Sequence, residues 1–150
     1  MTLSAIKPAE FRWFPYEGFT FCLGLTEGDV AWTSGHTSAR HDETIGKMTV
    51  EGSMDTQARI AYAKCLAILE AAGFGPEDVT RVSENITVVG LQAYDDAAGV
   101  RRELLGDRPT VRTVVVERLV RRAAWIEVEL HAVKSGGQQL RAASEAREAG

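Results

Sequence analysis

The chain has 150 residues, of which 45% are hydrophobic and 25% are charged, and its net charge is −4. This length and composition predict one globular domain with a substantial core. The acidic balance argues against nucleic acid as a partner, because phosphate neutralisation needs a surplus of Lys and Arg. No apolar run reaches the roughly 20 residues that span a bilayer, and the N-terminus does not read as a signal peptide. We therefore expect a cytoplasmic protein with no membrane partner.

The cysteines and histidines predict neither a disulfide nor a metal site. Cys22 and Cys65 each lie in an apolar pattern outside any CxxC motif, which favours two buried, reduced thiols. His36, His41 and His131 share no metal-ligand spacing with each other or with a cysteine. We therefore expect no bound metal.

The first 50 residues predict a lead-in followed by two strands. Residues 1–18 contain four aromatic side chains around two prolines, which indicates an extended segment whose rings pack on the body. Strands are expected at 19–25 and 29–34, with a turn between them, and a short one at 47–50. Ser34 and Gly35 end the second strand. By themselves they favour a turn over a hydroxyl and backbone amides that face a ligand.

The middle of the chain predicts two helices that flank a strand. Residues 53–72 predict a helix, with Ser53 or Asp55 as the cap and Gly73 as the stop. Its expected core-facing stripe contains Ile60, Ala63, Ala67 and Ala71, widened by Leu66 and Leu69. A strand is expected at 79–89 and a second helix at 94–105. The C-terminal residues 135–150 predict a peripheral tail with some helix propensity.

Two further strands, 109–119 and 125–133, are predicted to pair as a hairpin. The first is a β-branched run, typical of a strand buried on both faces. The second alternates strictly between apolar and polar residues. A turn near residues 120–121 would put Val114 opposite Glu127 and Arg112 opposite Glu129. This arginine and these carboxylates form either a cross-strand ion pair or part of a functional site.

The element order ββαβαββ predicts an α+β domain over residues 19–134, with a six-stranded mixed sheet and two helices on one face. The other sheet face would expose polar residues and valines over a broad, half-apolar area. An oligomer would cover that face.

The order and spacing of several segments resemble the RidA (YjgF) family of enamine/imine deaminases, over about residues 20–133. The segments are WTSG (32–35), DTQAR (55–59), AILEAAG (67–73), DVTRV (78–82), PTVRTV (109–114) and IEVE (126–129). The arginine that precedes the first Glu of the IEVE segment by fifteen residues is the most specific feature.

The resemblance implies a chorismate-mutase-like fold and a homotrimer whose sheets form a central barrel, with clefts between subunits. It implies hydrolysis of enamines and imines to 2-keto acids and ammonia, without a cofactor. Arg112 would pair with the substrate carboxylate, and its planar fork suits that role. Glu127 and the backbone carbonyl of Val114 would hold the attacking water, and Ser34 with Gly35 would face the ligand.

The chain departs from the family at two pocket positions. Phe21 stands where the family has a tyrosine, and Tyr16 could replace that hydroxyl if the lead-in folds back. Ala98 stands where the family has an asparagine. These changes favour larger or more apolar substrates, with Phe21 in the substrate pocket. They also favour an alternative function, a non-catalytic trimer that binds a keto acid or another small metabolite. Ribonuclease activity, attached to some relatives, is disfavoured by the acidic charge.

Overall fold

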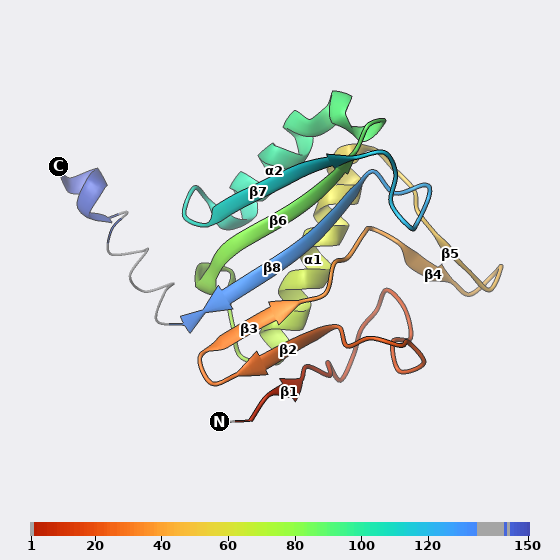
Figure 1. Cartoon of the computed structure of the whole chain (residues 1–150), viewed down its shortest axis with the longest axis horizontal. Coiled ribbons are helices and arrows are strands. Elements are labelled where there is room, and N and C mark those ends of the chain that lie inside the picture. The colour runs from red at the N-terminus through yellow and green to blue at the C-terminus, as the bar shows by residue number, and fades with distance from the viewer. Residues whose placement is uncertain (1, 135–142, 144) are drawn as a thin grey trace.

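The computed structural model describes residues 2–134, 143 and 145–150, so most of the expected tail at 135–150 lies outside the described residues. A six-stranded mixed sheet forms one layer, and two long helices cover one of its faces (Figure 1). The predicted α+β class is confirmed. Across the sheet the strands are β1 (Ser4–Ala5), β2 (Gly24–Glu27), β3 (Val30–Thr33), β8 (Ile126–Val133), β6 (Val79–Thr87) and β7 (Thr110–Val116).

Both helices form where capping residues and apolar spacing predict them. In α1 (Met54–Ala71) the Ser53 side chain accepts a hydrogen bond from the backbone N–H of Thr56, and Gly73 follows at φ +86°. The second helix, α2 (Tyr94–Leu105), begins and ends at the predicted residues and is followed by Gly106 at φ +68°. The buried face of α1 differs from the expected stripe. Completely buried against the sheet are Ala58, Ala61, Cys65, Ile68 and Leu69. Leu69 is the one buried member of the expected stripe, since Ile60, Ala63, Leu66 and Ala67 are half-buried and Ala71 is exposed. Within the described part of the chain, neither helix has the length and apolar character needed to cross a membrane.

The alternation in β8 sorts its side chains as predicted. Ile126, Val128, Leu130 and Ala132 are buried in the core, whereas Glu127, Glu129 and His131 are half-buried on the opposite face. Neither α1 nor α2 covers that opposite face (Figure 1). We call it the open face of the sheet, and all the polar residues of β8 lie on it.

The predicted β7–β8 hairpin is wrong, because β6 lies between these two strands. Strand β6 pairs in parallel with β7 and antiparallel with β8, so the two backbone edges of this long strand are both hydrogen-bonded. Asn85 therefore separates Val114 from Glu127, and Ser83 separates Arg112 from Glu129. The connection through α2 explains this order, since a strand–helix–strand unit brings its second strand alongside the first in parallel.

Strand β7 is also not buried on both faces, as its β-branched composition predicted. It lies at the edge of the sheet and most of its residues are exposed in this chain. The lead-in packs on the body as expected, with Phe14 buried, and it also contributes β1 at the opposite edge of the sheet, which the sequence did not predict. A separate hairpin, β4 (Arg40–Asp42) with β5 (Lys47–Thr49), and two short 3-10 helices, Pro76–Asp78 and Gly90–Ala93, complete the fold.

Candidate functional site

The Glu127 carboxylate lies against the backbone of Gly35, a contact between two segments that are distant in sequence. His36 and Val128 fix this contact by exchanging two backbone hydrogen bonds, both of 2.9 Å. A Cβ at position 35 would lie 2.9 Å from Glu127 Oε1 and 3.0 Å from its Cδ. Glycine is therefore required at position 35 for the carboxylate to approach the backbone so closely. The carboxylate also accepts a hydrogen bond from Asn85, whose Nδ2 lies 3.5 Å from Oε1.

A cavity of about 250 Å³ opens beside this contact, and three of the predicted site residues border it: Phe21, Gly35 and Glu127. They come from the segment before β2, the segment after β3, and β8. The fold therefore brings together residues that lie up to 106 positions apart in the sequence, the separation of Phe21 and Glu127. The remaining wall is formed by aromatic, aliphatic and basic side chains: Phe14, Phe19, His36, Thr37, Ala39, Met48, Lys64, Val120 and Arg121.

Two basic side chains of this cavity are buried. The ammonium group of Lys64, on α1, donates to the backbone carbonyls of Thr37 and Ala39 and lies 5.0 Å from the centre of the Phe14 ring. Burial lowers the pKa of Lys64 to about 7. Burial likewise lowers the pKa of His36 to about 4, so this imidazole is neutral at pH 7. Lys64 thus fixes the loop that carries Gly35 and His36 to α1.

Ser34 does not point its hydroxyl proton at the cavity. The hydroxyl donates to the backbone carbonyl of Cys22 at 2.5 Å, which ties the end of β3 to the segment before β2. This contact supports the interpretation of Ser34 as a turn residue over its interpretation as a ligand contact. Tyr16 comes close to Phe21 because the lead-in folds back, but its hydroxyl donates to the Pro8 carbonyl at 2.6 Å. Tyr16 therefore does not supply the free hydroxyl that Phe21 lacks.

Arg112 and Val114 lie apart from this cavity, on the edge strand β7. Thr113 between them points to the helix-covered side, where its hydroxyl donates to the buried Glu84 carboxylate at 2.9 Å. Because side chains alternate along a strand, Arg112 lies on the open face, as does Glu127. Within one chain, the whole width of β6 separates the two side chains that the sequence predicts to act together.

A buried polar network anchors β7 from the helix side. Glu84 accepts hydrogen bonds from Tyr62 at 2.6 Å and from Arg101 at 2.7 Å, in addition to Thr113. Burial opposes the charge of Arg101, but its hydrogen bond with the Tyr94 hydroxyl and the charge of Glu84 raise the pKa of Arg101 above its ordinary value. Burial raises the pKa of Tyr62. Ala98, the second departure from the family, borders a different cavity between α2 and the start of β7.

Sequence reasoning missed Lys64, Asn85 and the Glu84 network. The signal for Lys64 was present, since it lies on the buried stripe of α1 three residues after Ala61 and four before Ile68. A charged residue on such a stripe indicates a buried charge with specific partners. Asn85 carried no such signal, because its neighbours depend on which strands pair. Among the described residues, no group of three or more His, Cys, Asp or Glu side chains is placed to hold a metal ion.

The chain matches a known protein family over most of its length. The model of the family described as endoribonuclease L-PSP matches residues 19–134, most of the chain. The chain belongs to this family. It is the YjgF/RidA family, so the resemblance seen in the sequence is confirmed.

Solved structures of YjgF/RidA proteins share the fold. A putative endoribonuclease from Thermotoga maritima is 27% identical with a TM-score of 0.71, over 83% of this chain and 94% of that one. TdcF from E. coli, solved with bound serine, is 25% identical with a TM-score of 0.68, over 85% and 98% of the two chains. The Rid-family protein YyfA from Yersinia pestis is 19% identical and shows the fold alone, with a TM-score of 0.71 over 88% and 99%. No curated protein sequence is a significant match.

Proposed function

We propose that this YjgF/RidA protein is a cofactor-independent deaminase, which hydrolyses 2-imino acids and their enamine tautomers to 2-keto acids and ammonia. One observation carries the proposal: the Glu127 carboxylate reaches a cavity beside Gly35 and Phe21. A carboxylate in a partly enclosed, largely aromatic cavity suits the orientation of a water molecule. The serine bound to TdcF supports a small ligand that carries a carboxylate.

Arg112 would hold the substrate carboxylate through its bidentate guanidinium group. Glu127 and the Val114 backbone carbonyl would orient a water whose oxygen attacks the imine carbon. The nitrogen takes up a proton, the carbon–nitrogen bond breaks and ammonia leaves, so imine and water become keto acid and ammonia. Imines hydrolyse readily, so positioning and charge stabilisation would suffice.

The proposed site requires more than one subunit. Glu127 borders the cavity, whereas Arg112 lies beyond β6 at the free edge of the sheet. A homotrimer in which the edge strand of one subunit borders the cavity of the next would bring both groups to one cleft. It would also cover the open face, whose outward residues include Glu129 and His131. Size measurement by light scattering tests this assembly, and a monomer at working concentration would contradict it.

The test of activity is the decay of iminopyruvate, generated by an amino-acid oxidase and followed by trapping with semicarbazide. Arg112→Ala is expected to lower kcat/KM about 10- to 100-fold, the loss of a hydrogen-bonded charge pair. Arg102→Ala is the matched control, because Arg102 lies exposed on α2 and pairs only with Asp107 among the residues described. A wild-type protein that does not accelerate the decay, or an Arg112→Ala variant equal to wild type, would refute the proposal.

The alternative is a trimer that binds a keto acid without turnover. The absence of a hydroxyl at Phe21 favours it, since Phe21 brings no polar group to the cavity and the Tyr16 hydroxyl, bonded to Pro8, does not replace one. Calorimetry that detects keto-acid binding while imine decay stays at the buffer rate would select this function. The net charge of −4 supports either small-molecule function over RNA cleavage.

A further inference from the structure

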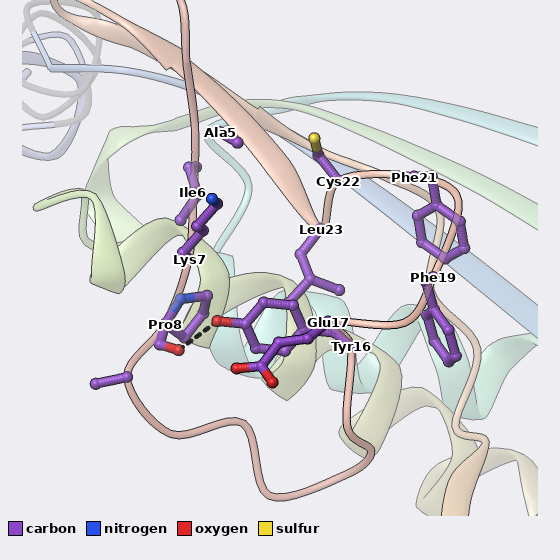
Figure 2. A pocket seen from close by; sticks show the side chains of 11 residues that line it. Ala5, Ile6, Lys7, Pro8, Tyr16, Glu17, Phe19, Phe21, Cys22 and Leu23 are labelled. Atoms are coloured by element: carbon purple, nitrogen blue, oxygen red, sulfur yellow. Dashed lines mark hydrogen bonds between the residues drawn. The ribbon is translucent and has the colours of Figure 1, made fainter.

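A second, larger cavity of about 480 Å³ lies between the folded-back lead-in and the segment that leads into β2. Figure 2 shows Phe19 and Phe21 on one side of it and Pro8 on the other, with Leu23 and Tyr16 between them and the Tyr16 hydroxyl bonded to Pro8. The rings of Phe19 and Phe21 lie 5.5 Å apart, centre to centre. The cavity is therefore built largely from the side chains of one sequence segment and from the lead-in that folds over it.

Phe19 and Phe21 border both cavities, so the larger one adjoins the cavity that contains Glu127. The ring of Phe14, whose centre lies 5.0 Å from the centre of the Phe19 ring, extends the row of rings to His36. We call Phe14, Phe19 and Phe21 the aromatic wall. Phe19 is 39% exposed and Phe21 is 51% exposed, so the end of the wall that faces the larger cavity is uncovered in this chain.

Size and charge indicate what could occupy the two cavities together. The smaller cavity falls below the roughly 300–1,000 Å³ of ordinary ligand pockets, whereas the larger falls within it. The ionisable groups that border the larger cavity include one cation, Lys7, and one carboxylate, Glu17, both exposed. Their opposite charges offer no excess positive charge for a second carboxylate. An apolar group is the better match for the rings and for Leu23.

Resting on the deaminase function proposed above, we propose that the aromatic wall selects imino acids with an aromatic or large apolar side chain. The carboxylate and imine end occupies the cavity of Glu127, and the side chain lies against Phe19 and Phe21 towards the larger cavity. Phe21 then determines specificity, since a ring without a hydroxyl presents only apolar surface to the substrate. Edge-to-face or offset contacts with such a side chain add to the burial of its surface.

The test compares imines made from phenylalanine and from alanine by a broad-specificity amino-acid oxidase, with kcat/KM measured for each. Wild type is expected to favour the phenylalanine-derived imine at least about tenfold, and Phe21→Ala to reduce that ratio about two- to tenfold. Leu91→Ala is the control, because Leu91 is an exposed apolar residue that borders neither cavity. It is expected to keep the wild-type ratio, and circular dichroism checks the folding of each variant.

Binding of the products gives a readout that does not depend on turnover. Calorimetry is expected to show tighter binding of phenylpyruvate than of pyruvate, with the difference reduced in Phe21→Ala. Equal rates for both imines, or a preference for the smaller one, would overturn the specificity and leave the deaminase function intact. If neither imine decays faster than in buffer, the deaminase function fails. In that case the binding measurement alone tests the aromatic wall. Tighter binding of phenylpyruvate than of pyruvate, reduced in Phe21→Ala, would support its role, and equal binding of the two keto acids would refute it.

Discussion

The substitution Lys64→Met tests whether the buried ammonium group controls the stability of the fold near neutral pH. An ordinary lysine has a pKa of 10.5, and burial lowers that of Lys64 to about 7. Between these values the unfolded chain carries a proton that the folded chain has lost, so the free energy of unfolding rises with pH. From pH 6 to pH 8.5 this group contributes an increase of about 2 kcal/mol. Methionine fills a similar volume and removes the titration.

The assay is urea unfolding followed by tryptophan fluorescence, at several pH values and one fixed protein concentration. The free energy of unfolding of wild type minus that of Lys64→Met is expected to rise by about 2 kcal/mol from pH 6 to pH 8.5. The charge of Lys64 helps to lower the pKa of His36, but burial is the larger cause and keeps folded His36 neutral above pH 6, so its contribution cancels in the difference. Lys47→Met is the control, because Lys47 is exposed on β5, and its difference should stay flat. A flat or falling difference for Lys64→Met would refute the reasoning.

Three further predictions concern burial. Arg101→Leu should lower the free energy of unfolding by about 3 kcal/mol, because it leaves the Glu84 carboxylate buried without its cation; a loss below about 0.5 kcal/mol would contradict this. Ile68→Ala should cost about 3 kcal/mol in the same assay, since Ile68 is completely buried, and a smaller loss would mean that the core closes around the gap. Cys22 is exposed, contrary to the expectation of two buried thiols, so thiol titration of the native protein should detect Cys22 rapidly. Cys65 should react only after unfolding, because it is buried and burial raises its pKa to about 12. Rapid reaction of both thiols would show that the core opens.

Local patterns predicted both helices and strands β3, β5, β6, β7 and β8, whereas β1, β4 and the strand pairing were beyond them. The strand expected at 19–25 is formed by Gly24–Glu27 instead. Helix α2 has the predicted ends because Asp95, Asp96 and Gly106 mark them within its own sequence. The alternation of β8 likewise needs only neighbouring residues. Which strand lies beside β7 depends on the connection through α2, and a register drawn from the turn alone put β8 there instead of β6.

The same division applies to the candidate site. Glu127, Gly35 and Phe21 were predicted from motifs, and the fold brings all three to one cavity. Lys64 and Asn85 were missed because their importance comes from contacts made across the fold, with the Thr37–Ala39 loop and with Glu127. The register that placed Arg112 opposite Glu129 and Val114 opposite Glu127 was wrong for the same reason as the hairpin, since it depended on adjacent strands.

The contact between Gly35 and Glu127 also constrains how this chain can vary over evolutionary time. A methyl group at position 35 would collide with the far end of the Glu127 side chain, not with backbone, so Gly35→Ala should displace the carboxylate without unfolding the chain. Glycine at 35 is thus required only while a long carboxylate stands at 127. Relatives that have a shorter residue at the second position are expected to accept alanine or serine at the first, and the two positions should change together.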